Sequence, residues 1–187
     1  ELISKEEKKD ILVIAEIANA HEGDFDKAMD LIKAAAVAGA NAVKFQKFTA
    51  DELLVPTHPR YEHFRNLEMT EDEWRRLYGF AHEKGLLFFS DVFGLESLHF
   101  IKSLPADGIK IHSSDLANVH LLNKVADWSD TLLISCGGAS ELDIFRALKI
   151  INPYGRGKKV LLMHGFQNFP TSLNETNLLR IKTLGET

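Results

Sequence analysis

The sequence has few of the features that mark secreted, membrane-bound or nucleic-acid-binding proteins. It holds a single cysteine in 187 residues, so Cys136 cannot form an internal disulfide and a reducing cytoplasm is the expected environment. Its longest apolar runs, such as residues 11–15 and 160–163, are far shorter than the roughly 20 residues that a membrane-spanning helix needs. Basic residues number 22 against 27 acidic ones and form no basic stripe, which argues against a nucleic-acid partner.

The composition is that of an ordinary globular chain. Hydrophobic residues make up 45% and charged residues 26%, which fits one well-filled domain and excludes a wholly disordered chain. Residues 1–10 mix both charges and lack the apolar segment of a signal peptide. We therefore expect residues 1–10 to be an N-terminal lead segment and residues 11–187 to form the domain.

Six short apolar runs alternate with helical patterns along the chain. The runs are rich in Val, Ile, Leu and Phe, which is typical of buried parallel strands, and cover residues 11–18, 41–48, 86–91, 108–113, 131–136 and 159–164. Helices are predicted over residues 24–38, from the capping box at residues 70–73 to near Gly85, from Ser140 onward, and over residues 174–184. Residues 155–159 are predicted to form a turn, and residues 49–69 a long connection.

Alternating strands and helices predict an α/β fold with a parallel sheet. Two architectures fit this order, an open doubly wound sheet and a (β/α)₈ TIM barrel. The first run lacks the glycine-rich turn of a dinucleotide-binding sheet, whereas a complete barrel needs eight strands and about 250 residues. We therefore expect an incomplete (β/α)₈ TIM barrel with about six of its eight βα units, with an open six-stranded sheet as the alternative.

Polar side chains interrupt several of the predicted strands. Charged residues inside a parallel strand cost several kcal/mol if they are unpaired, and the strand carboxyl ends are where active sites of parallel α/β folds lie. A single buried Glu–Lys pair is as often structural as functional, but the set predicts one shared site. Two lysines with two hydroxyls would bind an anion. The residues concerned are Glu16, Lys44, Gln46, Lys110, His112, Ser113 and Ser135.

The histidines and the cysteine give no specific motif for metal binding or nucleophilic catalysis. No pair has the spacing of a known metal motif, so no metal ligand is assigned in this chain. His21, His112 and His164 follow strand ends and could line the site, whereas His82 and His99 fall on predicted helices and His58 and His63 in the long connection. Cys136 is predicted to be a small buried residue, since no activating base is adjacent.

Short motifs at these same positions resemble the sialic acid synthase family, enzymes that condense phosphoenolpyruvate with a sugar. The matching segments follow one another in order from about residue 11 to residue 184. They are Ile14-Ala-Glu-Ile with His21-Glu-Gly-Asp, Ala42-Val-Lys-Phe-Gln, Lys110-Ile-His-Ser-Ser-Asp-Leu, Ile134-Ser-Cys-Gly, Leu162-Met-His and Phe169-Pro-Thr. Each motif alone is weak, but their order and spacing together are specific.

The resemblance implies a role for each matching residue. Lys44, Lys110, Ser113 and Ser135 are expected to hold the phosphate and carboxylate of phosphoenolpyruvate. Glu16, Gln46 and Asp115 are expected to meet an N-acylmannosamine-type sugar or act near its carbonyl, with Glu16, Asp115 and Lys110 as the catalytic residues and Asp115 as the candidate for proton transfer. Gln167 and Phe169 occupy further substrate-binding positions, where the family usually has Asn or Ser and Tyr.

The resemblance also implies the reaction and its partners. C3 of the enol attacks the open-chain aldehyde, water adds to the resulting oxocarbenium centre, and phosphate leaves by C–O cleavage, giving a sialic acid or related nonulosonate. A divalent metal, Mn²⁺ or Mg²⁺, polarises the aldehyde, and its histidine ligands come from the seventh and eighth strands, which this chain does not include. A cytoplasmic homodimer is expected for the full-length enzyme.

Two departures from the family pattern bear on the site. Asp91 stands where the family has a phosphate-contacting threonine, and a carboxylate there would repel phosphate unless it is protonated or turned away. Gly165 follows His164 where the family has cysteine. These changes predict altered phosphoenolpyruvate binding and a divergent acceptor sugar.

Two other functions remain open. A strand lysine such as Lys110 could form a Schiff base with a carbonyl substrate, as in an aldolase. A partial barrel with exposed strand edges could instead serve as a non-catalytic interaction module, because such edges attract pairing partners.

Overall fold

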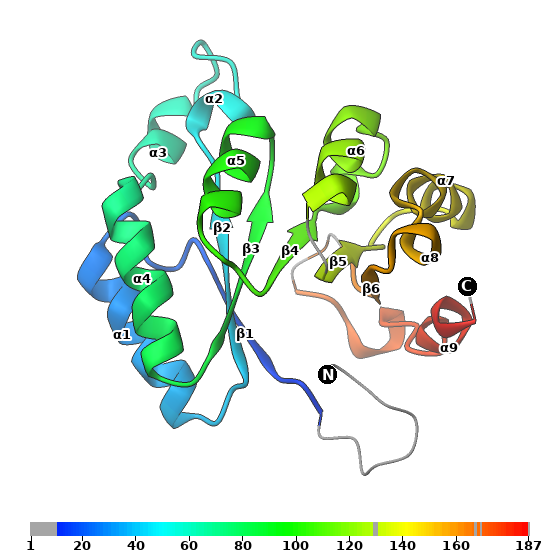
Figure 1. Ribbon diagram of the computed structural model, residues 1–187, viewed down its shortest axis with the longest axis horizontal. Coiled ribbons are helices and arrows are strands. Elements are labelled where there is room, and N and C mark those ends of the chain that lie inside the picture. The colour runs from blue at the N-terminus through cyan, green and yellow to red at the C-terminus, as the bar shows by residue number, and fades with distance from the viewer. Residues whose placement is uncertain (1–10, 129–130, 167, 169, 187) are drawn as a thin grey trace.

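The computed structural model describes residues 11–128, 131–166, 168 and 170–186. Its centre is a six-stranded parallel sheet in which each strand pairs with the next one along the chain (Figure 1). The strands are β1 (Ile14–Ala18), β2 (Ala42–Lys47), β3 (Leu87–Val92), β4 (Gly108–Ile111), β5 (Thr131–Ser135) and β6 (Lys159–Met163). The lead segment expected over residues 1–10 lies outside the described residues.

The strand order decides between the two predicted architectures. A doubly wound sheet reverses its order at a switch point, whereas here the order β1-β2-β3-β4-β5-β6 never reverses. Because parallel crossovers are right-handed, a sheet that always advances in one direction keeps every crossover helix on one face. The prediction of an incomplete (β/α)₈ barrel with six βα units is therefore confirmed, and the open doubly wound alternative is wrong.

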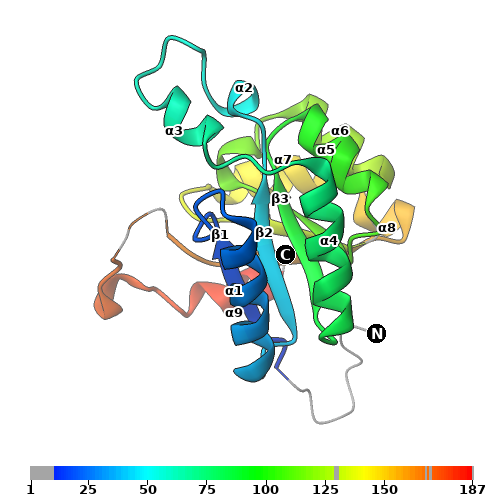
Figure 2. The ribbon, with the colours of Figure 1, turned by 90° about the vertical axis from the view of Figure 1, so that its left-hand side faces the viewer.

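The helices cover the outer face of the curved sheet, as Figures 1 and 2 show for α1 and α4, which pack against each other. The longer ones are α1 (Phe25–Val37), α4 (Glu71–Glu83), α5 (Leu95–Ser103), α6 (Val119–Trp128) and α7 (Glu141–Ile151). Short helices are α2 (Ala50–Leu53), α3 (Tyr61–Arg65), α8 (Pro153–Arg156) and α9 (Arg180–Gly185), with the 3₁₀ turns η1 (Ser113–Asp115) and η2 (Leu173–Glu175). Within the described residues, no helix is both long and apolar enough to cross a bilayer.

Local sequence signals account for most helix boundaries. The predicted capping boxes are present, since the amide of Glu73 donates to Thr70 Oγ1 at 3.3 Å and the amide of Asp143 donates to Ser140 Oγ at 3.2 Å. Each bond satisfies one of the amides that a helix leaves free in its first turn. Gly39, just beyond α1, has φ +81°, the left-handed conformation that ends helices at glycine.

Two predicted elements differ from the structure. The helix predicted over residues 174–184 is instead η2 followed by α9, because Asn177 between them takes a left-handed φ of 41°. The turn predicted at residues 155–159 is partly helical, since Pro153 opens α8 and the Asn152 side chain accepts from the amide of Gly155. Proline at the first helical position and an asparagine cap both favour a short helix there.

Strand alternation sends side chains to two different apolar clusters. The outer cluster lies between the sheet and the helices, and it includes Phe45, Phe88, Trp74 and most of the other buried apolar residues. The inner cluster, on the concave face of the sheet, has only Ala42, Phe89 and Leu133 fully buried. The concave face therefore has a small apolar base, extended by the partly buried Ile14, Leu87, Leu161 and Met163, and charged side chains lie beside it.

Candidate functional site

The polar side chains of the concave face come from neighbouring strands at matched heights. The strand register places Glu16 beside Lys44, Gln46 beside Asp91, and Asp91 beside Lys110. Residues two apart in a strand point to the same face, so Lys44 and Gln46 share the concave side of β2. Parallel pairing thus brings the charged residues of β1, β2, β3 and β4 into one row.

Ion pairs connect the row from end to end. Lys44 Nζ lies 2.7 Å from Glu16 Oε2 and also contacts Asp91 Oδ2, while Lys110 Nζ lies 2.7 Å from Asp91 Oδ1. One Asp91 carboxylate therefore binds two ammonium groups, one on each oxygen. We call Glu16, Lys44, Asp91 and Lys110 the ionic row.

Three of the four charged side chains in the ionic row are buried, so each would destabilise the fold if it lacked a partner of opposite charge. Asp91 is fully buried, the Lys44 side chain is 2% exposed and that of Lys110 is 10% exposed, whereas the Glu16 side chain is 50% exposed. A lone buried charge costs several kcal/mol, and removing one partner of a buried pair is strongly destabilising. The two positive and two negative charges cancel, so the row as a whole carries no net charge.

The remaining predicted site residues in the described part of the chain come from β2, from β5 and from the turn after β4. Gln46 Oε1 accepts a hydrogen bond from Asn19 Nδ2 at 2.9 Å. Ser135 lies on β5 two residues beyond Leu133, which pairs with Lys110. Ser113 and Asp115 form η1 just after β4, where Asp115 accepts from Ser114 Oγ at 3.3 Å.

Gln167 and Phe169, the other two predicted substrate-binding residues, lie outside the described residues. The described part of the chain contains no group of three or more His, Cys, Asp or Glu side chains that could hold a metal ion.

The charges of the ionic row influence the pKa of His112. Burial lowers its pKa below 6.5, the nearby Lys110 lowers it further, and Asp91 and Asp115 act in the opposite direction. At neutral pH the imidazole is therefore uncharged and can accept or donate hydrogen bonds without repelling a cation. Its ring packs near Phe93, with the ring centroids 5.9 Å apart.

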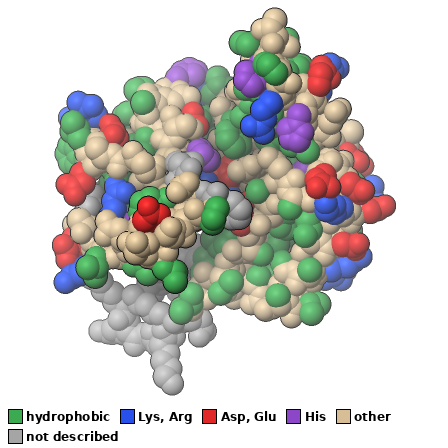
Figure 3. Space-filling view, turned by 180° about the vertical axis from the view of Figure 1, so that it is seen from behind, with side chains coloured by type: hydrophobic (Ala, Val, Ile, Leu, Met, Phe, Trp, Pro, Cys, Tyr) green, Lys and Arg blue, Asp and Glu red, His purple; other side chains and the backbone are tan. Residues whose placement is uncertain are grey.

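Two other histidines at strand ends serve local structure. His21 is buried in the outer layer against Phe45 and Trp74, and its Nδ1 accepts from the amide of Gly23 at 3.0 Å. Burial and the nearby Lys27 lower its pKa. His164 Nε2 lies 2.7 Å from the carbonyl oxygen of Thr176. Figure 3 shows histidine side chains in the upper half of one face of the molecule.

Cys136 is buried as predicted, and burial raises the pKa of its thiol. A raised pKa keeps the sulfur protonated and unreactive, which agrees with its predicted role as a small core residue.

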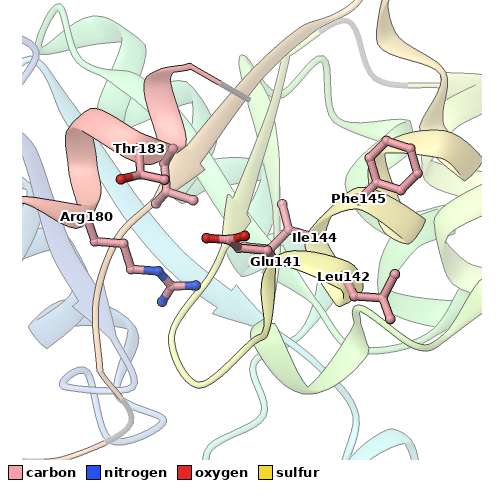
Figure 4. A pocket seen from close by; sticks show the side chains of 7 residues that line it. Glu141, Leu142, Ile144, Phe145, Arg180 and Thr183 are labelled. Atoms are coloured by element: carbon pink, nitrogen blue, oxygen red, sulfur yellow. The ribbon is translucent and has the colours of Figure 1, made fainter.

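A surface pocket of about 430 Å³ lies away from the ionic row, between α7 and α9. Glu141, Ile144, Arg180 and Thr183 line it with other residues of these helices (Figure 4). Arg180 donates from Nη1 to the carbonyl oxygen of Cys136 and from Nη2 to that of Ala139, at 3.2 and 2.8 Å. The arginine thus fixes the loop that follows β5.

Asp91 and Asn19 make contacts at this face that sequence reasoning did not assign. The sequence marks Asp91 only as a departure from a family pattern, since nothing in a linear sequence reveals that one carboxylate bridges lysines from two other strands. Asn19 begins the turn that follows β1, whose last residue, Ala18, has a positive φ of 46°. That turn directs the Asn19 amide toward Gln46, and no local motif predicts it.

Fold and site together define a (β/α)-barrel protein with a largely buried ionic row on the concave face of its sheet. Residues 31–187 match the sequence pattern of the NeuB family, and the chain belongs to that family. The chain spans about half the length of the curated relatives that it matches.

Named relatives include synthases of legionaminic acid, pseudaminic acid and N-acetylneuraminate derivatives. The chain is 31% identical to the N,N'-diacetyllegionaminic acid synthase of Legionella pneumophila, over 93% of the chain and 54% of that protein. It is 30% identical to the N-acetylneuraminate-9-phosphate synthase of Drosophila melanogaster, over 98% of the chain and 53% of that protein.

Solved structures agree with this assignment. The N-acetylneuraminic acid synthetase of Leptospira borgpetersenii, solved in complex with citrate, superposes with a TM-score of 0.88 at 29% identity, covering 95% of the chain and 62% of that structure. The spore coat polysaccharide biosynthesis protein SpsE of Bacillus subtilis gives 0.83 at 30% identity, covering 96% of the chain and 51% of that structure.

Proposed function

We propose that the protein condenses phosphoenolpyruvate with an N-acylmannosamine-type sugar and releases phosphate, and that this chain supplies the phosphoenolpyruvate-binding side of the site. The observation that carries the proposal is the pair of buried lysines, Lys44 and Lys110, on neighbouring parts of one concave face. Family membership supports the reaction class, since several relatives are named as synthases of such sugar acids.

The residues around the row have chemistry suited to each part of this reaction. Lys44 and Lys110 supply positive charge for the phosphate and carboxylate, and Ser113 and Ser135 supply hydroxyl donors that orient them. Gln46, held by Asn19, and the half-exposed Glu16 offer hydrogen bonds to a sugar. Asp115 is the candidate for proton transfer near the sugar carbonyl, and Lys110 stabilises charge on the departing phosphate.

In this reaction C3 of the enol forms a bond to the aldehyde carbon, whose oxygen takes a proton. Water then adds to C2, and the C2–O bond to phosphate breaks. A divalent metal of the kind expected from the resemblance would act on the aldehyde oxygen. The described residues offer no ligand cluster for it, and the roles proposed here are those of this chain's own residues.

A phosphate-release assay tests the proposal. The protein, with any sequence that follows Thr187 included, is incubated with phosphoenolpyruvate, N-acetylmannosamine and Mn²⁺, and inorganic phosphate is measured. We expect release that depends on both substrates and is lost in Lys110→Met but kept in Lys33→Met, which changes an exposed surface lysine. Failure to release phosphate with every hexosamine acceptor tested would contradict the proposal.

The Schiff-base alternative has less support from the geometry. A Schiff base needs an unprotonated amine, and the Lys110 nitrogen instead donates to a fully buried carboxylate as part of an ion pair. Borohydride trapping with a carbonyl substrate, read by mass spectrometry, distinguishes the two reactions. A covalent adduct at Lys110 would favour the aldolase.

The proposal extends to the setting of the enzyme. A cytoplasmic homodimer fits the family resemblance, and the single buried cysteine needs no oxidising compartment. The non-catalytic alternative, in which the outer strands β1 and β6 recruit a partner, has no specific contact in its favour. A protein that binds such a partner but releases no phosphate in the assay would support that alternative.

A further inference from the structure

The carboxylate of Asp91 stands where a bound anion would be expected. Its two oxygens each take one ammonium, from Lys44 and from Lys110, and no part of the side chain is exposed. Two ammonium groups that converge on one small group with paired oxygens are the arrangement by which lysines bind a carboxylate or a phosphate. In this protein the chain itself provides that group.

Lys44 and Lys110 differ in how many N–H donors remain for an incoming anion. Lys44 contacts both Glu16 and Asp91 and is almost fully buried. Lys110 has Asp91 as its one acceptor among the described residues, although an ammonium has three N–H donors. Lys110 is also the more exposed of the two, so an incoming anion can contact it while Asp91 still occupies Lys44.

Charge balance leads to the same result. With Glu16 and Asp91 in place, the positive charges of both lysines are already cancelled. An anion that enters this row gains little net attraction and meets a buried carboxylate of the same sign, which is unfavourable at short range.

We propose that Asp91 is a specificity-determining residue, an internal counterion that competes with anionic substrate for Lys44 and Lys110 and so weakens anion binding. The inference rests on the proposed function in one respect, namely that these lysines hold the anionic groups of the substrate. A purely positioning role for Asp91 predicts the opposite sign, because removing a residue that holds the lysines in place would weaken anion binding.

The test is a titration of inorganic phosphate, at constant ionic strength, into wild type, Asp91→Ala and Asp91→Asn, with affinity read by calorimetry and by the shift in melting temperature. Asp91→Asn keeps the shape and removes the charge, so it serves if the alanine variant does not fold. Asp127→Ala is the control, because Asp127 is an exposed partner of Arg156.

We expect both Asp91 variants to bind phosphate about tenfold more tightly than wild type, and acetate to raise the melting temperature of Asp91→Ala by filling the position of the missing carboxylate. The control should match wild type. Equal or weaker phosphate binding in both Asp91 variants would overturn the inference.

The inference and the proposed function can fail separately. If wild type releases phosphate from phosphoenolpyruvate but the Asp91 variants bind phosphate no more tightly, the counterion role is wrong and the reaction stands. If the variants bind phosphate more tightly while wild type yields no product with any acceptor, the counterion role stands and the reaction is wrong.

Discussion

The two faces of the sheet bury very different side chains. On the outer face, Phe88 stacks on Phe45 with ring centroids 5.4 Å apart, within a continuous apolar cluster that includes residues from most of the helices. On the concave face, Phe89 belongs to a cluster of three fully buried apolar residues, beyond which lie the charges of the ionic row.

The difference separates stability from function along the same strands. Buried apolar area is the main favourable contribution to folding, so the outer face holds the fold together. Buried charges stabilise a fold no better than well-packed apolar residues, so the ionic row is better explained by a binding role. The same strand therefore serves both purposes. In β3, Phe88 points to the outer face and stabilises the fold, whereas Phe89 and Asp91 point to the concave face, where Asp91 belongs to the ionic row.

The largest effect is expected on the outer face. Phe88→Ala should lower the free energy of unfolding by about 4 kcal/mol, because it removes a fully buried ring and leaves a cavity. Urea denaturation measures this loss. Phosphate affinity of the folded variant should equal that of wild type, and a change in affinity would break the separation between the two faces.

A smaller loss is expected within the ionic row. Lys44→Met should lower the free energy of unfolding by about 3 kcal/mol, because it leaves the buried Asp91 with one cation in place of two. Lys33→Met, at an exposed pair, should change stability by less than about 0.5 kcal/mol. Equal free energies of unfolding for the two variants would show that the charges of the ionic row are still solvated by water, contrary to their burial.

Ser140→Ala tests how much the N-terminal cap of α7, on the outer face, contributes to stability. Loss of the hydrogen bond from the Asp143 amide to Ser140 Oγ should cost about 1 kcal/mol, measured by thermal or urea unfolding. Ser140→Asn retains a capping oxygen and should recover most of that loss. Phosphate binding should be unchanged in both variants, and a large change would connect this helix cap to the site.

The titration of His112 gives the smallest but most local effect. Its pKa is lowered in the folded state, so the folded protein binds fewer protons than the unfolded chain, and its contribution to stability is present above pH 6.5 and is lost as the pH falls through the folded pKa. NMR titration should show a rise in this pKa in Lys110→Met and a further fall in Asp91→Asn. An unchanged pKa of His112 in both variants would show that His112 does not sense the row.

Periodic patterns in the sequence predicted the strands, the helices α1, α4 and α7, and the barrel, because buried strands and capped helices are encoded by nearby residues. Lys44 and Lys110 were found because charges inside apolar runs are unusual. The bridging role of Asp91 depends on the register of three strands, which determines which side chains lie side by side across the sheet. No local sequence pattern encodes that register. The break at Asn177, in a predicted helix, likewise depends on a backbone conformation that composition does not reveal.

Calorimetric titration of phosphoenolpyruvate is the most direct test of the claim that the concave face is an anion-binding site. The account predicts saturable binding to wild type, unchanged in Lys33→Met and weakened at least about tenfold in Lys110→Met, the loss expected for one charge-assisted hydrogen bond. Binding to Lys110→Met with the affinity of wild type would contradict it.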